Sequence, residues 1–150
     1  MQENLDAKAD KLSRLEKSLF ELSAVINRHQ EIVQRRFKVT AVEIDILKLL
    51  SDEGDKKMKD IGDRVRVKLS NLTNIIDRLE TQKLVKRVNS KTDRRSIYVH
   101  ITTKGKKLLA DYADFLRELS TRMKQVMQDD QFGILVEGLE KISKVSLPEA

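Results

Sequence analysis

The chain has 150 residues, the length of one ordinary domain, and hydrophobic residues make up 39% of it. It contains no cysteine, which excludes disulfides, thiolate metal sites and cysteine-based redox sensing. No apolar run reaches the roughly 18 residues that a membrane span requires, and the polar first ten residues lack a signal-peptide core. We therefore expect a cytoplasmic protein with no membrane partner.

The formal net charge of +6 is concentrated in the middle of the chain. Residues 55–107 contain 16 Lys and Arg residues against 6 Asp and Glu residues, whereas the remainder contains 14 against 18. A basic segment between acidic ends indicates that this segment binds a polyanion. The alternative is a solvated charged surface without a partner.

Both ends of the chain carry helical apolar stripes. Apolar residues recur every seven positions between residues 5 and 33, with others three positions later, which predicts a long helix over 5–36 with a coiled-coil seam. A helix this long cannot bury both sides within a small domain, so we predict a two-fold homodimer formed by residues 1–36 and 103–150. The alternative is packing within one chain. The predicted interface residues are Leu12, Leu15, Leu19, Leu22, Ile26, Phe132, Leu135, Leu139 and Ile142.

The middle segment, residues 37–102, begins with a short helix. Thr40 and Glu43 have the spacing of a capping box, which predicts a helix from there to about Ser51 and a turn at 52–55. Another short helix is predicted at 58–65.

A tight connection at 66–68 leads into a further predicted helix, residues 69 to about 82, and the pair forms a helix-turn-helix. Its apolar stripe is Leu69, Leu72, Ile76 and Leu79, and its opposite face is polar. Ser and Asn side chains on such a face can pair with base edges or phosphates of DNA, and Lys68 and Arg78 are placed to meet phosphates. Asp77 would repel phosphates, so we expect it to pair with a nearby Arg or Lys. The alternative is an ordinary polar surface.

Two strand-like runs at 84–88 and 96–101, joined by a basic linker, predict a β-hairpin. Ile97, Val99 and Ile101 are expected on one face of the second strand. A basic hairpin tip can place an Arg in the minor groove, and a neighbouring carboxylate can orient that Arg. The alternative is a surface ion pair of little energetic value. Thr102 or Thr103 is expected to cap a long helix that follows.

Two stretches together resemble one family. Residues 61–87 read IGDRVRVKLSNLTNIIDRLETQKLVKR, and residues 93–105 read DRRSIYVHITTKG. They resemble the helix-turn-helix and the wing of the MarR family (multiple antibiotic resistance regulators). The resemblance implies a mainly α, winged helix-turn-helix homodimer that binds palindromic operators in double-stranded DNA, usually as a repressor. It also implies that Arg95 enters the minor groove. The predicted DNA-binding residues are Lys68, Ser70, Asn71, Thr73, Asn74, Arg78, Lys91, Asp93, Arg94 and Arg95.

The sequence departs from the family pattern at two positions. Lys68 stands where the family usually has a small or capping residue, and Lys83 stands where it usually has Gly. Both departures concern the ends of the predicted recognition helix. The cysteine of the family's peroxide-sensing branch is absent, which excludes that mechanism here.

No catalytic, cofactor or metal site is expected. The chain has 2 His, and it lacks HExxH, G-x-S-x-G and phosphate-loop motifs, so an enzyme is not expected. Two hypotheses remain. One is a repressor that responds to a small aromatic or anionic effector bound between the interface helices and the DNA-binding lobe. The other is a constitutive or architectural DNA-binding protein without an effector. An apolar cleft closed by polar groups would favour the first.

Overall fold

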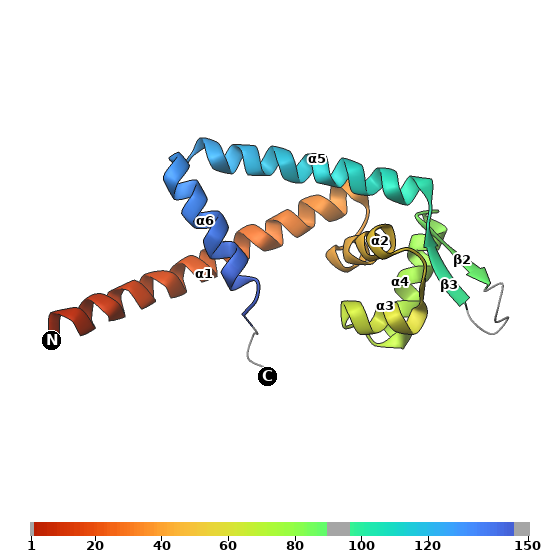
Figure 1. Ribbon diagram of the computed structural model, residues 1–150, viewed down its shortest axis with the longest axis horizontal. Helices are drawn as coiled ribbons and strands as arrows, with labels where there is room; N and C mark the ends of the chain where they lie inside the picture. The colour runs from red at the N-terminus through yellow and green to blue at the C-terminus, as the bar shows by residue number, and fades with distance from the viewer. Residues whose placement is uncertain (1, 90–96, 146–150) are drawn as a thin grey trace. The chain divides into compact units, whose positions relative to one another are not determined.

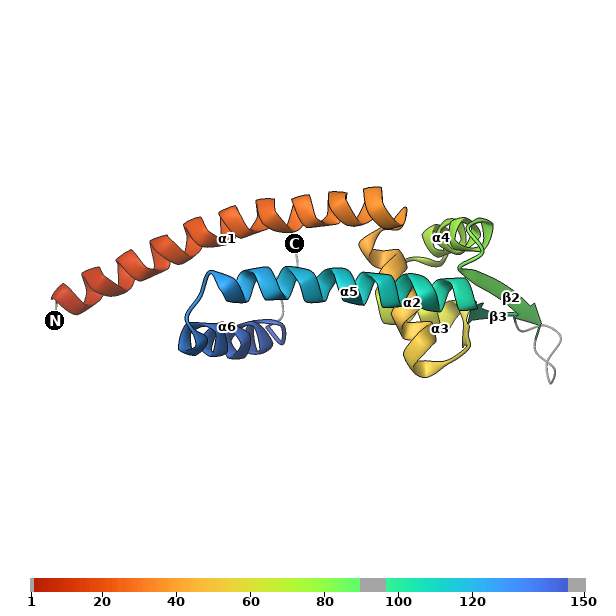
Figure 2. The same ribbon diagram turned by 90° about the horizontal axis from the view of Figure 1, so that it is seen from above.

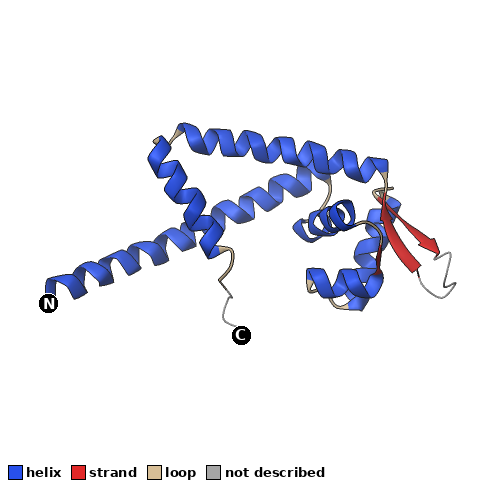
Figure 3. Ribbon diagram, viewed as in Figure 1, coloured by secondary structure: helices blue, strands red, loops and turns tan. Residues whose placement is uncertain are grey.

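A computed structural model describes residues 2–89 and 97–145, with side chains from residue 10 onward. The described chain is mainly helical, with its strands confined to one small sheet (Figures 1 and 3), as the sequence predicts. It divides into two compact units, residues 1–109 and 110–150. The elements are α1 (Gln2–Phe37), α2 (Ala41–Glu53), β1 (Lys56–Lys57), α3 (Met58–Val65), α4 (Leu69–Thr81), β2 (Val85–Asn89), β3 (Ile97–Ile101), α5 (Thr103–Gln125) and α6 (Asp129–Ile142).

The sheet has three antiparallel strands in the order β1-β3-β2. The predicted hairpin is confirmed, with Val85 opposite Ile101 and Asn89 opposite Ile97. The strand β1 is unexpected, since two lysines offer no alternating pattern and their pairing depends on β3. The turn predicted at 52–55 is also wrong in part, because α2 continues to Glu53 and ends at Gly54, whose φ is 78°.

The core of the first unit lies among α2, α3, α4 and the sheet, which lie side by side in both views (Figures 1 and 2). Of the predicted apolar stripe on α4, all but one residue is fully buried. The exception is Leu69, whose exposed fraction is 58%. Helical side chains lean toward the helix N-terminus, so the side chain of the first residue extends past the end of α4 instead of over the core. The buried hydrophobic residues are Val33, Val39, Ile44, Ile46, Leu47, Leu50, Ile61, Leu72, Ile76, Leu79, Leu84, Val85, Val99 and Ile101.

The end of α4 explains one departure from the family pattern. The N–H of Leu84 donates to the carbonyl of Leu79 at 2.9 Å, and the N–H of Lys83 donates to that of Glu80 at 2.8 Å. This is a Schellman motif, which needs a left-handed residue after the helix, usually Gly. Lys83 occupies that position with φ 60°. A non-glycine residue is therefore held in a strained backbone conformation.

The start of α5 depends on a close approach between two backbones. The hydroxyl of Thr102 accepts from the N–H of Gly105 at 3.1 Å, so Thr102 is the capping residue. A Cβ on Gly105 would lie 2.4 Å from the carbonyl oxygen of Leu84. Only glycine fits here, because that carbonyl also accepts from the N–H of Thr102 at 3.0 Å and fixes the strand end against the helix.

The terminal helices bury little. Val33 is the buried hydrophobic residue of α1 among the side chains described, and α6 has no buried residue within its bounds. Across the helices that the structure describes, none combines the length and apolar character of a membrane span.

Replacing Lys83 by Gly should stabilise the protein. Relief of the left-handed strain is worth about 1–2 kcal/mol, and the greater freedom of Gly in the unfolded chain removes about 0.5–1 kcal/mol of it. We expect the free energy of unfolding, measured with urea, to rise by about 1 kcal/mol. Lys83→Ala is the matched control, since it removes the same charge but keeps the strain. An equal gain in both variants would show that the strain is not the cause.

Candidate nucleic-acid interface

The exposed face of α4 carries the side chains that the sequence assigns to base reading. Ser70, Asn71, Thr73 and Asn74 are all exposed along its first half. Lys68 is exposed at the N-cap and makes no capping hydrogen bond with its side chain. The structure thus confirms that these residues share one accessible helix end. Their contact with DNA stays a prediction.

A buried carboxylate on α2 fixes the position of α4. Glu43 is 2% exposed, and among the side chains described it is the buried charged one. Its Oε2 accepts from the Thr40 N–H at 2.7 Å, and its own N–H donates to the Thr40 hydroxyl, which confirms the predicted capping box of α2. Its Oε1 accepts from Nε of Arg78 on α4 at 3.0 Å. One carboxylate therefore caps α2 and holds α4.

This pairing changes the expectation for Arg78. The sequence places Arg78 against DNA phosphates, and its side chain is 57% exposed. Its Nε and one terminal nitrogen face Glu43, both at 3.0 Å. The guanidinium is thus anchored before any DNA arrives, and phosphate contact by its remaining N–H groups stays a prediction.

A second arginine ties the far end of α4 to the hairpin. Arg87 on β2 pairs with Asp77 at 2.6 Å and with Glu80, and its backbone N–H also donates to Glu80 at 2.9 Å. Burial alone would lower the pKa of Arg87, but the hydrogen bonds to Asp77 and Glu80 outweigh it and raise that pKa above its ordinary value. The predicted pairing of Asp77 with a nearby cation is confirmed. Its negative charge is therefore compensated on the face that carries the DNA-binding candidates.

The tip of the hairpin holds the other predicted DNA-binding residues. Lys91, Asp93, Arg94 and Arg95 lie outside the described residues, so the orientation of Arg95 by Asp93 stays a prediction. The described strands fix the base of this hairpin through β2–β3 pairing.

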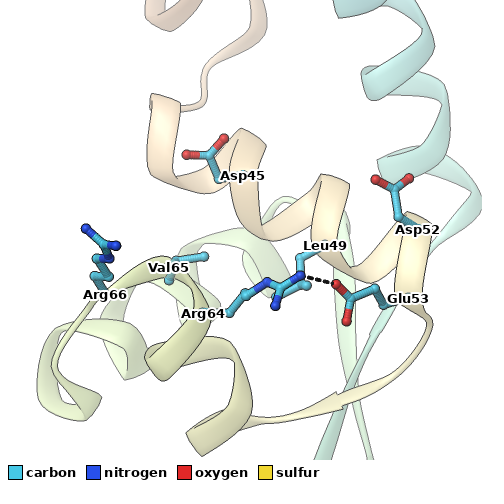
Figure 4. Close-up of a pocket in the computed structure, with 7 residues that line it drawn as sticks. All are labelled: Asp45, Leu49, Asp52, Glu53, Arg64, Val65 and Arg66. Carbon is cyan, nitrogen blue, oxygen red and sulfur yellow. Dashed lines mark hydrogen bonds and ion pairs between the residues drawn. The ribbon is translucent and has the colours of Figure 1, made fainter. Parts of the chain in front are cut away.

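An open cavity of about 350 Å³ lies between α2 and α3 (Figure 4). Five of its seven lining residues are charged, and Arg64 reaches across it to Glu53 at 2.9 Å. A hydrogen bond from Lys56 lowers the pKa of Glu53, with help from the positive charge of Arg64. Such a charged surface is unlike the apolar cleft that would favour the effector hypothesis.

Sequence reasoning missed the pairing of Glu43 with Arg78. The two residues lie 35 positions apart, and no local pattern joins them. The one available signal was the capping box, which identifies Glu43 but involves only one of its oxygens and carries no information about the partner of the other.

Comparison with known proteins gives consistent matches. The model of the MarR family matches residues 39–97. The chain is 30% identical over 118 residues to the HTH-type transcriptional regulator MhqR of Bacillus subtilis (strain 168), covering 78% of this chain and 81% of that protein. The structure of YusO from Bacillus subtilis has a TM-score of 0.78 at 23% identity, covering 90% of this chain and 96% of that one. Streptococcus pneumoniae FabT, solved in complex with DNA, has a TM-score of 0.74 at 21% identity, covering 88% and 94%.

Replacing Glu43 by Gln should destabilise the protein by about 1–3 kcal/mol. The variant keeps the shape of the side chain, and its amide oxygen can still accept one hydrogen bond, so the loss is about one charge-assisted hydrogen bond, worth about 1.5–3 kcal/mol. Urea unfolding measures the change. The control is Glu53→Gln, because the pair of Glu53 with Arg64 is exposed and should contribute much less. Equal losses in the two variants would contradict the anchoring role of Glu43.

Proposed function

Because the chain belongs to the MarR family of transcriptional regulators, we propose that it represses transcription by binding a palindromic operator in double-stranded DNA as a homodimer. It is a regulator with a DNA-binding winged helix and not an enzyme. The observation that carries the proposal is the exposed polar end of α4, supported on one side by Glu43 and on the other by Arg87. A recognition helix must be presented rigidly, because its contacts depend on fitting the major groove.

The charge of the lobe supports the same partner. Exposed basic residues flank α4 on neighbouring elements, including Arg66 in the turn before it, Lys83 after it and Lys86 on β2. Such residues give affinity through phosphates, while the Ser and Asn side chains of α4 give specificity through base edges. In one relative, FabT, DNA is bound to a protein of this fold.

Dimerisation is supported by the apolar seam of α1. Leu12, Leu15, Leu19, Leu22 and Ile26 are each between 44% and 52% exposed, although their seven-residue repeat is that of a packed helix. Leu139 and Ile142 of α6 are likewise exposed, while Phe132 and Leu135 are half-buried. A second copy would cover the exposed apolar residues of each helix, and a two-fold pair would present two recognition helices to half-sites about 34 Å apart.

The second part of the proposal is release from the operator by a small aromatic or anionic effector, the alternative being constitutive binding. An effector acts only through its different affinities for the DNA-binding and the released states. Thermal unfolding and operator binding, followed together during titration with phenolic and carboxylate compounds, separate the two. Constitutive binding is supported if neither changes.

DNA affinity should fall steeply with salt. If the dimer makes six or more phosphate contacts, the dissociation constant rises roughly a thousandfold or more between 50 and 200 mM salt. Fluorescence anisotropy on a labelled duplex measures it. Lys68→Ala should reduce the log–log slope by about 2, one contact per protomer. Lys17→Ala on α1 should leave it unchanged. A slope near zero in the parent protein would overturn the proposed function.

Placing a charge in the seam of α1 should dissociate the dimer. Leu22→Glu puts a carboxylate at a d position, where burial without a partner costs several kcal/mol. We expect a folded monomer or a soluble aggregate by sedimentation, with weakened operator binding. Ala24→Glu adds the same charge two residues away, on the side opposite the seam, and should remain dimeric. If Leu22→Glu also sediments as a dimer, the interface lies elsewhere.

A further inference from the structure

Two side chains on the exposed end of α4 present carbon instead of polar atoms. Leu69 is 58% exposed at the first position of the helix. Thr73 is exposed four residues later, and its hydroxyl donates to the carbonyl of Leu69 at 3.0 Å. Because the single hydrogen of this hydroxyl is used within the helix, Thr73 offers a partner its γ-methyl group but no hydroxyl donor.

The side chains of Leu69 and Thr73 lie next to each other on one face of α4. Residues four positions apart lie above one another on an α-helix, so Leu69 and Thr73 are neighbours. They lie beside the polar residues Ser70 and Asn74, on the turn that leads into the proposed major-groove contact. A single exposed leucine on a protein surface is ordinary. A leucine at the N-terminal end of a recognition helix is placed where side chains meet base edges.

The chemistry of the major groove offers one apolar group. Thymine presents its C5-methyl group there, whereas the other three bases carry no methyl group and are distinguished by hydrogen-bond donors and acceptors. The exposed methyl groups of Leu69 and Thr73 match it. Asn71 and Asn74 can read N6 and N7 of adenine from the neighbouring face of the same helix.

Building on the proposed DNA-binding function, we propose that Leu69 and Thr73 select thymine in each half-site by contacting its C5-methyl group. Sequence preference at these positions then comes from burying methyl groups, and hydrogen bonds contribute nothing to it. The half-site is rich in A·T pairs under the first turn of α4.

The test removes the methyl group from the DNA. The full-length protein first selects its operator from a pool of random duplexes, and each thymine of that operator is then replaced by deoxyuridine, one position at a time. At the thymine under Leu69 we expect the dissociation constant of the parent protein to rise about fourfold, which corresponds to about 0.8 kcal/mol for one buried methyl group. Leu69→Ala should bind the unmodified operator about five- to tenfold more weakly and should tolerate deoxyuridine there without further loss.

A matched pair of variants tests Thr73. Thr73→Val keeps the methyl group and removes the hydroxyl, so it should keep the preference for thymine over deoxyuridine. Thr73→Ser keeps the hydroxyl and removes the methyl group, so it should lose that preference. Circular dichroism and urea unfolding should show both folded.

The outcomes separate this inference from the function on which it rests. If no sequence is enriched and no duplex is bound, the proposed function and the methyl contact both fall. If an operator is enriched but deoxyuridine is tolerated at every position, or if Leu69→Ala stays as sensitive to it as the parent, only the methyl contact is wrong.

Discussion

Glu43 places a charged group inside the core of the DNA-binding lobe, and the orientation of α4 depends on how that charge is compensated. A buried carboxylate without partners would cost several kcal/mol. Here one oxygen closes the first turn of α2 and the other receives Arg78 from α4. The two helices are joined by an interaction that exists only in one relative position, because hydrogen bonds weaken steeply with distance and angle.

Arg87 supplies the matching constraint on the other side. It joins β2 to Asp77 and Glu80 on α4, so the hairpin and the helix are fixed to each other at the base of the wing. The ion pair with Arg87 also compensates the negative charge of Asp77, which reduces the repulsion of a polyanion at this face of α4. The lobe thus combines support from acidic residues, of which Glu43 is buried, with accessible basic and amide groups on its surface, which is the arrangement that a groove-binding helix needs.

The connections between α4 and β2 and between β3 and α5 contain a strained residue and a close contact between two backbone segments. Lys83 holds a left-handed conformation after α4, and Gly105 leaves room for the Leu84 carbonyl beside α5. Both positions determine where the recognition helix stops and where the strand begins. The terminal helices show the opposite character, with apolar seams open to solvent in a single copy of the chain. The core of the lobe is thus buried within one chain, whereas the cover of the α1 seam by a second copy is part of the proposed function.

The amino-acid sequence alone determined the elements and the polar face of α4. Periodicity, the Thr40–Glu43 spacing and the alternation of Val99 with Tyr98 act locally, so they predict α2, α3, α4 and the hairpin to within a few residues. The tertiary structure decided which contacts these elements make. The pair Glu43–Arg78 joins residues 35 positions apart, and the strand β1 exists only because β3 offers it an edge. Leu69 has the sequence spacing of the buried stripe, but its side chain is exposed to solvent. Burial depends on what covers the end of a helix, and periodicity carries no information about that.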